Sequence, residues 1–312
     1  MAKPNFILPN KPAIKAGSIL SYNYTDDLKF AAEPLDFSRN SSATRVNEQG
    51  LIEEVGYFGP QLVQNGDFSQ EGSELITNGD FATDSGWSKG TGWSISGGSA
   101  SRTAQSGSTA CDQSISLNAN KTYKIVYDLT VDAGSFNVRF SGTTNVNGET
   151  RTTSGTYTDY LKAATGNNTF RLVGADSTFT GSIDNVSVKE VGQDWVLGTG
   201  WSIGDGVVSA NAPTGNLDQS LTATSGSKYR VTFTISNYVS GDIRWRFTGT
   251  TNENGTLRSA DGTYTEEITL TNNQSVFRFP PTSAVMDIDN VSVKEIIGDK
   301  PRIDYSDSST EP

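Results

Sequence analysis

A long internal repeat constrains this chain more than any other feature of its sequence. The residues IDNVSVKE at 183–190 occur again, unchanged, at 288–295. RFSGTTN at 139–145 returns as RFTGTTN at 246–252, and GWSI at 92–95 returns at 200–203. The spacing of about 107 residues exceeds the roughly 20–50 residues of solenoid repeats, so each copy is expected to be a domain with its own core.

The pattern of apolar residues within a copy predicts an all-β fold. Residues 121–130 alternate polar residues with Tyr123, Ile125 and Tyr127, and 135–141, 169–173 and 183–188 alternate in the same way. Such alternation is typical of half-buried antiparallel strands. Asn-Gly pairs at 147–148 and 254–255 suit tight hairpin turns. With no helical period in view, the sequence predicts a two-sheet β-sandwich in each copy.

Missing and scarce residue types exclude several classes of function. The chain of 312 residues has no histidine, which removes the commonest general base, the commonest zinc ligand and every Ser–His or Cys–His nucleophile. Its single cysteine, Cys111, cannot form an internal disulfide and is expected to pack as a small apolar group. With 24 Lys and Arg against 35 Asp and Glu, the net charge is −11, which disfavours nucleic acid as a partner and favours solubility.

No targeting or membrane segment stands out in the sequence. The first 20 residues contain lysines but no apolar run of signal-peptide length, and no stretch approaches the roughly 20 apolar residues of a membrane span. We therefore expect no membrane insertion and a protein kept in a cytosol until it is assembled.

Both ends of the first copy resemble the galactose-binding-like jelly roll of carbohydrate-binding modules. The matching segments are LITNGDF at 75–81, Gly86-Trp87 and the closing strand 183–188. The resemblance implies two tandem jelly-roll β-sandwiches, at 61–192 and 193–297. It also implies that the opening and closing strands of each jelly roll lie side by side.

The chain departs from this family in two ways. An acid often follows the opening Phe and helps to hold a structural calcium, but Ser69 and Ala82 stand there, so only Asp184 and Asp289 remain as calcium candidates. The alternative is that these two residues cap turns. Secondly, Asn-Gly-Asp-Phe occurs twice in the first copy, at 65–68 and 78–81, and not in the second. One of the two serves the second module or is a leftover duplication.

The segments before and after the two modules differ from the modules in sequence pattern. They resemble a segment of phage tail-fibre and related virion proteins. The match runs from Phe37 through Ala43-Thr44-Arg45-Val46-Asn47 to Gly50-Leu51-Ile52-Glu53, and continues as Pro-Arg-Ile-Asp-Tyr at 301–305. It implies an extended docking segment at 1–60, a tail at 298–312 and two modules inserted between them. The implied docking residues are Phe37, Arg39, Thr44, Arg45 and Asn47.

Sugar binding by jelly rolls depends on aromatic faces that stack on pyranose rings. Trp245 is the first candidate because its counterpart in the other copy is Val138, so the shared core does not require it. The alternative for each repeated tryptophan is packing in the core. The remaining candidates are Trp87, Trp93, Trp195, Trp201, Tyr160 and Tyr238.

Together these features predict a non-enzymatic structural protein of a bacteriophage virion. We expect a tail or head fibre that contacts other virion proteins, forms a homotrimer as such fibres commonly do, and adheres to glycans of the host surface. A capsid decoration protein without glycan binding is the alternative. A fibre-borne polysaccharide depolymerase is less favoured, because no pair of carboxylates stands out with aromatic residues in both copies.

Overall fold

The computed structural model describes residues 58–107 and 109–297 in full, together with the backbone of five strands before them. These are β1 (Ile14–Lys15), β2 (Ser18–Tyr24), β3 (Phe30–Pro34), β4 (Ala43–Val46) and β5 (Ile52–Val55). β1, β2 and β3 form an antiparallel sheet, and β4 pairs with β5. The chain divides into two units, Met1–Gly59 with Ile296–Pro312, and Pro60–Glu295.

The predicted virion-docking residues fall in the first of these units. Phe37, Arg39 and Asn47 lie outside the described residues, as does the 301–305 segment. Thr44 and Arg45 lie in the backbone of β4. Their docking role therefore stays a prediction.

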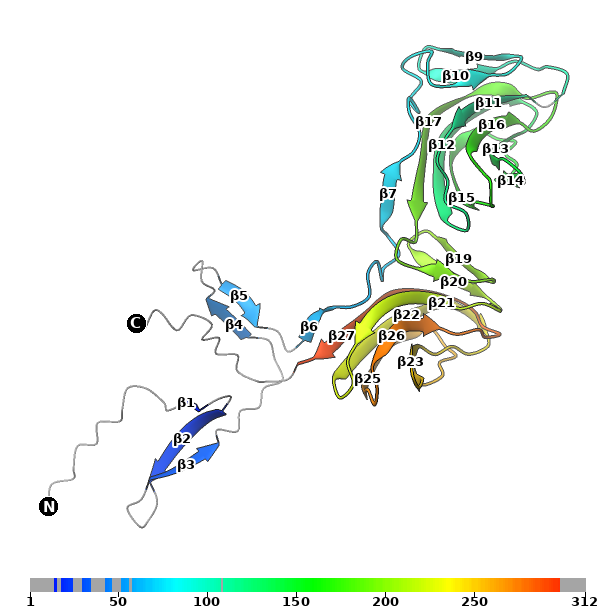
Figure 1. Ribbon diagram of the computed structural model, residues 1–312. Helices are drawn as coiled ribbons and strands as arrows, with labels where there is room; N and C mark the ends of the chain where they lie inside the picture. The colour runs from blue at the N-terminus through cyan, green and yellow to red at the C-terminus, as the bar shows by residue number, and fades with distance from the viewer. Residues whose placement is uncertain are drawn as a thin grey trace. The chain divides into compact units, whose positions relative to one another are not determined.

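The first sandwich, called module 1, consists of two antiparallel sheets (Figure 1). One sheet has the order β15-β12-β17-β10-β9 with β7 also on β17, and the other has the order β14-β13-β16-β11-β8. The strands are β7 (Glu71–Glu74), β8 (Ser88–Lys89), β9 (Trp93–Ser96), β10 (Ser99–Arg102), β11 (Ala110–Ser114), β12 (Thr122–Ala133), β13 (Phe136–Ser141), β14 (Val146–Asn147), β15 (Gly155–Lys162), β16 (Thr169–Gly174) and β17 (Thr180–Val191).

The second sandwich, called module 2, repeats this arrangement strand for strand. Its sheets have the orders β19-β20-β27-β22-β25, with β6 on β27, and β18-β21-β26-β23-β24. The strands are β6 (Phe58–Gln61), β18 (Val196–Leu197), β19 (Trp201–Gly204), β20 (Val207–Asn211), β21 (Leu217–Ala223), β22 (Lys228–Ser240), β23 (Arg246–Gly249), β24 (Glu253–Asn254), β25 (Gly262–Thr269), β26 (Gln274–Phe279) and β27 (Val285–Ile296). The prediction of an all-β fold with two tandem jelly-roll sandwiches is confirmed.

Each strand pair buries one face, as the alternation in sequence requires. In β12 the side chains of Tyr123, Ile125 and Tyr127 are buried, while Lys124 and Val126 between them are partly exposed. Cys111 packs in the same core and is completely buried, and burial raises the pKa of its thiol to about 12. None of the described residues forms a helix long and apolar enough to cross a membrane.

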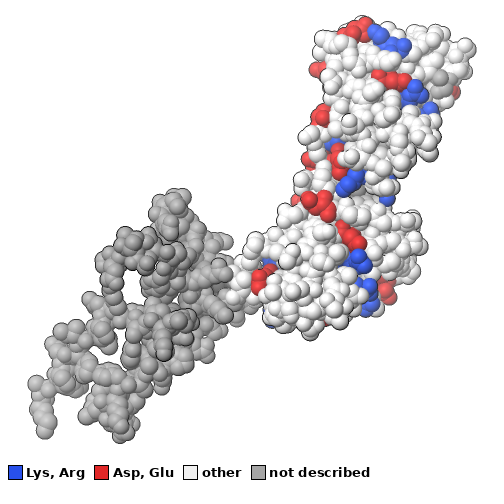
Figure 2. All heavy atoms as spheres, viewed as in Figure 1, with Lys and Arg blue, Asp and Glu red and all other residues white. Residues whose placement is uncertain are grey.

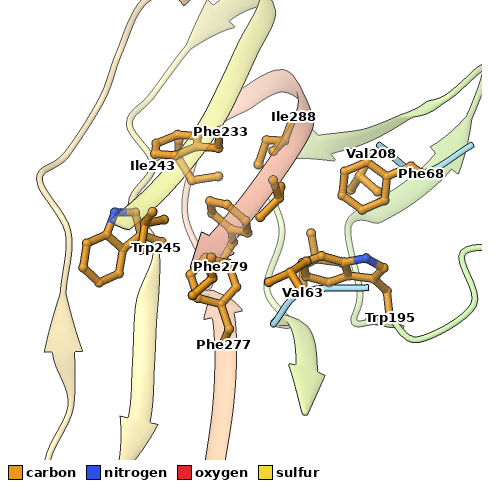
Figure 3. Close-up of a cluster of buried hydrophobic side chains, with 14 of the residues drawn as sticks. Val63, Phe68, Trp195, Val208, Phe233, Ile243, Trp245, Phe277, Phe279 and Ile288 are labelled. Atoms are coloured by element: carbon orange, nitrogen blue, oxygen red, sulfur yellow. The ribbon is translucent and has the colours of Figure 1, made fainter. Parts of the chain in front are cut away.

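The first Asn-Gly-Asp-Phe segment belongs to module 2. Val63 and Phe68 are buried in the module 2 core, where the ring of Phe68 lies 5.3 Å from that of Trp195 (Figure 3). The second segment serves module 1 in the same way, with Phe81 5.2 Å from Trp87. The expected boundary at residue 61 is therefore corrected. Residues 61–70 complete module 2, and module 1 is inserted between them and the rest of that module.

Glycine is required in both segments by the close approach of the closing strand. A Cβ atom on Gly66 would lie 1.9 Å from the carbonyl oxygen of Val291, and one on Gly79 would lie 2.0 Å from that of Val186. The same two glycines accept backbone hydrogen bonds from Val291 and Val186, of 2.8 and 2.9 Å. The opening and closing segments therefore lie side by side, as the jelly-roll resemblance implied.

Candidate functional site

The five tryptophans do not present their faces to solvent. Their exposed fractions run from 1% for Trp195 and Trp245 to 8% for Trp87. Three of the indole N–H groups donate to backbone carbonyls: Trp87 to Asn78, Trp195 to Asn65 and Trp201 to Gly215. The prediction that these rings stack on sugars is wrong, and the alternative of core packing holds for Trp87, Trp93, Trp195, Trp201 and Trp245.

Trp245 was the first candidate, and its burial has a clear physical cause. The indole stacks on Phe277 at a centroid distance of 6.4 Å (Figure 3). It also meets Phe247 edge-on at 5.5 Å. Gly255 also lies close to the indole, and a Cβ added there would come within 2.3 Å of the indole nitrogen. The absence of a counterpart in module 1 thus reflects a different filling of the core, because Val138 is also completely buried there.

The two candidate tyrosines are partly buried and engaged by the fold. Tyr160 donates from its hydroxyl to the Asp205 carboxylate at 3.1 Å and accepts from the Asp205 backbone N–H at 2.9 Å. This contact joins β15 of module 1 to the β19–β20 turn of module 2. The Tyr238 hydroxyl donates to the carbonyl of Gly241 at 3.2 Å. Both rings pack against the core of module 2.

The calcium candidates Asp184 and Asp289 lie within strands β17 and β27 and do not cap turns. One carboxylate oxygen of Asp184 accepts from the backbone N–H of Asn185, and Asp289 does the same for Asn290, each at 2.6 Å. Within residues 58–107 and 109–297 no group of three or more acids, histidines or cysteines is placed to hold a metal ion. These residues do not fit a calcium site, which needs several oxygen ligands at once.

A row of four polar side chains crosses the second sheet of module 1. Asp112 on β11 lies opposite Arg171 on β16, Arg171 lies opposite Arg139 on β13, and Arg139 lies opposite Asn147 on β14. These positions alternate with core residues such as Cys111, Leu172 and Phe140, so the row lies on the outer face of the sheet. We call it the Asp–Arg–Arg–Asn row.

Module 2 carries the same row on the equivalent sheet. Asp218 on β21, Arg278 on β26, Arg246 on β23 and Asn254 on β24 are opposite one another in the same order. Within the described residues, this is a polar constellation that both modules share on a solvent-facing sheet.

The contacts along the two rows are also the same. Arg171 donates to Asp112 at 2.6 Å, and Arg278 donates to Asp218 at 2.9 Å. At the other end, Nε of Arg139 donates to Asn147 at 2.6 Å and Nε of Arg246 donates to Asn254 at 2.8 Å. Each row thus contains an arginine paired with a carboxylate and an arginine oriented by a neutral amide.

The arginine held by asparagine keeps an uncompensated charge. Among the described residues, neither Arg139 nor Arg246 forms an ion pair with an acid. Each lies directly across from another arginine, and like charges in that position destabilise a sheet. In module 2 burial, and the nearby charges of Arg244 and Arg278, lower the pKa of Arg246.

A hollow lies at the carboxylate end of the row in module 2. The cavity, of about 310 Å³, is lined by Val196, Asp218, Gln219, Ser220 and Val276 from the sheet and by Gln64 and Asp194. Burial raises the pKa of Asp218, while Arg278 acts in the opposite direction. The row and the hollow together provide carboxylate, guanidinium, hydroxyl and amide groups on one surface.

Sequence reasoning missed this row although a signal was present. Asp112 and Asp218 are repeated within Asp-Gln-Ser, and Arg139 and Arg246 within Arg-Phe-Ser/Thr-Gly, but the four strands of each sheet are far apart in sequence. Only the sheet order places them in one line. Combining the repeat with an assumed jelly-roll strand order is the step that would have found it.

Comparisons with known proteins give a structural similarity only. No protein-family model matches the chain, and no curated protein matches it. A similar solved structure is the N-terminal CBM22-1-CBM22-2 tandem domain of Xyn10C from Paenibacillus barcinonensis, with a TM-score of 0.32 and 10% sequence identity over 73% of this chain and 98% of that one.

Proposed function

We propose that this chain is a non-enzymatic glycan-binding protein, displayed on a bacteriophage particle as a tail or head fibre. The observation that carries the glycan-binding part is the Asp–Arg–Arg–Asn row, present with the same contacts in both modules. A sheet face with fixed, planar hydrogen-bonding groups is suited to sugar hydroxyls, which both donate and accept.

Two rows in one chain also favour adhesion physically. A polysaccharide presents the same unit many times, so a second row binds at a high effective concentration once the first is engaged. A trimer of chains would multiply this effect. Weak single contacts would then suffice for firm attachment.

The virion part of the proposal rests on the resemblance of the flanks. The 37–53 segment and the 301–305 segment would dock on other virion proteins after assembly in the host cytoplasm. Mass spectrometry and antibody labelling of purified particles test this directly. Absence of the chain from particles would exclude a virion role and leave glycan binding open.

Glycan binding is tested with the full chain on an array of bacterial surface polysaccharides. We expect binding that falls at least tenfold when Asp112→Ala and Asp218→Ala are combined, since each removes an acceptor and frees its arginine partner. A matched control is Asp132→Ala, an exposed acid at the end of β12. Unchanged binding by the double variant would contradict the role of the row. Release of reducing sugar from any bound polymer would contradict the non-enzymatic assignment.

One observation favours the second candidate, a capsid decoration protein. All five tryptophans are buried, so the described surface lacks the indole platform common in sugar sites. A decoration protein would bind no polysaccharide on the array and would raise the temperature at which purified capsids release their genome. These two readouts separate the candidates.

A further inference from the structure

The charge balance of the two rows indicates which sugars they suit. Each row contains two arginines and one aspartate, and module 2 adds Arg244, two residues before Arg246 along the chain. The protein as a whole has a net charge of −11. On the face shown in Figure 2, blue and red atoms lie close together, without a large patch of one sign. The rows are therefore local sites of positive charge on an acidic protein.

The arginine in excess is also held in a way that presents it to a ligand. The Nε of Arg139 donates to Asn147, and the Nε of Arg246 donates to Asn254. The remaining guanidinium N–H groups of both arginines have no carboxylate partner among the described residues. A guanidinium fixed at one edge offers a planar fork that matches an oxyanion. Facing arginines cost stability unless an anion lies between or above them, and both modules nonetheless retain the pair.

We propose that the two rows bind acidic glycans, with Arg139 and Arg246 receiving the carboxylate or sulfate group of the sugar. This rests on the proposed function and narrows it to a class of ligand. The paired arginines, Arg171 and Arg278, would be held in place by their aspartates, which would also accept from sugar hydroxyls. The hollow beside Asp218 would take the next, uncharged part of the sugar in module 2.

Non-specific attraction does not account for such binding. A protein of charge −11 repels a polyanion at long range, so a preference for acidic polymers has to come from local contacts. The interaction should nevertheless weaken as salt rises, because the rows are partly exposed.

The test uses the full chain and matched polymers. Polygalacturonate is compared with the same polymer after reduction of its carboxyl groups to alcohols, and dextran sulfate with dextran, by calorimetry or surface binding at fixed salt. We expect at least tenfold tighter binding of an acidic polymer than of its neutral partner. The pair that shows the preference identifies the oxyanion as carboxylate or sulfate.

Substitutions assign the preference to the row. Arg139→Gln with Arg246→Gln should remove it, while Arg139→Lys with Arg246→Lys, which keeps the charge without the fork, should retain part of it. Lys162→Gln with Lys228→Gln removes two positive charges from the opposite sheets and should leave the preference intact. Thermal unfolding of each variant checks that the fold is kept.

Each outcome bears on one proposal or both. Equal affinity for acidic and neutral polymers, or a preference that survives Arg139→Gln with Arg246→Gln, overturns the acidic-glycan inference but not glycan binding. Binding only to neutral glycans on the array would also overturn the acidic-glycan inference and leave glycan binding standing. No binding to any polysaccharide overturns the proposed function as well.

Discussion

The two modules contain the same strands and the same polar row, yet they relate differently to the chain. Module 1 is formed by one continuous stretch that begins at β7 and ends at β17. Module 2 takes β6 and the segment through Phe68 from before that stretch, and the rest from after it. An internal repeat therefore marks what folds together without marking where each unit begins. The equivalence of the two modules also provides a matched control for every substitution.

The largest expected effect tests the nested arrangement. Phe68→Ala should destabilise module 2 by about 3–5 kcal/mol, as is usual for a buried Phe, because its ring packs on Trp195 at 5.3 Å. Hydrogen exchange should rise in β18–β27. The thiol of Cys111, which is completely buried in module 1, should stay unreactive toward a thiol reagent in the absence of denaturant.

Phe81→Ala is the matched control for that substitution. It should destabilise module 1 by a similar amount and expose Cys111, because Phe81 packs on Trp87 in the same core. If Phe68→Ala exposed Cys111 and left the exchange of β18–β27 unchanged, the assignment of the first segment to module 2 would be wrong.

A second effect concerns a buried arginine that only module 1 has. Arg102 is 1% exposed and donates to the carbonyls of Gly107, Asp176 and Phe179. Arg102→Met leaves those carbonyls without this donor, and an unsatisfied buried group costs about 1–3 kcal/mol. We expect a loss of about 3 kcal/mol, confined to module 1.

The corresponding position in module 2 is Ala210, which faces Trp201 as Arg102 faces Trp93. Ala210→Ser should have a much smaller effect on stability. Denaturant unfolding followed by Cys111 reactivity and by hydrogen exchange measures both variants. A loss shared equally by the two modules would show that they unfold as one cooperative unit.

A third prediction separates core packing from ligand binding at Trp245. Trp245→Val introduces the residue that module 1 has at Val138, and should destabilise module 2 by about 2–4 kcal/mol because a cavity remains beside Phe277. Affinity for glycans at a temperature where the variant is folded should not change. A loss of binding with little loss of stability would restore this tryptophan as a binding residue.

The sequence predicts more of the fold than of the candidate site. Alternation in segments such as 121–130 and the repeated closing strand depend on local pattern, and the structure follows them. Burial of an aromatic ring depends on neighbours from distant strands, so Trp245 could not be placed from its lack of a counterpart. The polar row could be recognised only from the order of four strands. The assignment of Asn65–Phe68 to module 2 depended on the hydrogen bond between Gly66 and Val291 of β27, which are far apart in the sequence.

The smallest expected effect concerns an acid that each module holds between two cations. Glu71 contacts Lys124 and Lys189 in module 1, and Glu267 contacts Lys228 and Arg230 in module 2. Hydrogen bonds to these cations lower the pKa of both carboxyls below the ordinary value of 4.5. A lowered pKa contributes stability that is present above the pKa of the unfolded chain and lost as pH falls through that of the folded chain.

Glu71→Gln and Glu267→Gln should therefore each reduce stability at pH 7 by at most about 0.5–1 kcal/mol, since both carboxylates are partly exposed and screened. Each should also flatten the loss of stability of its own module below about pH 4.5. Denaturant unfolding from pH 7 to pH 3 measures this, with Asp132→Asn as the control. A substitution that flattened the acid loss of the other module would mean that these charges act across the modules and not within one sheet.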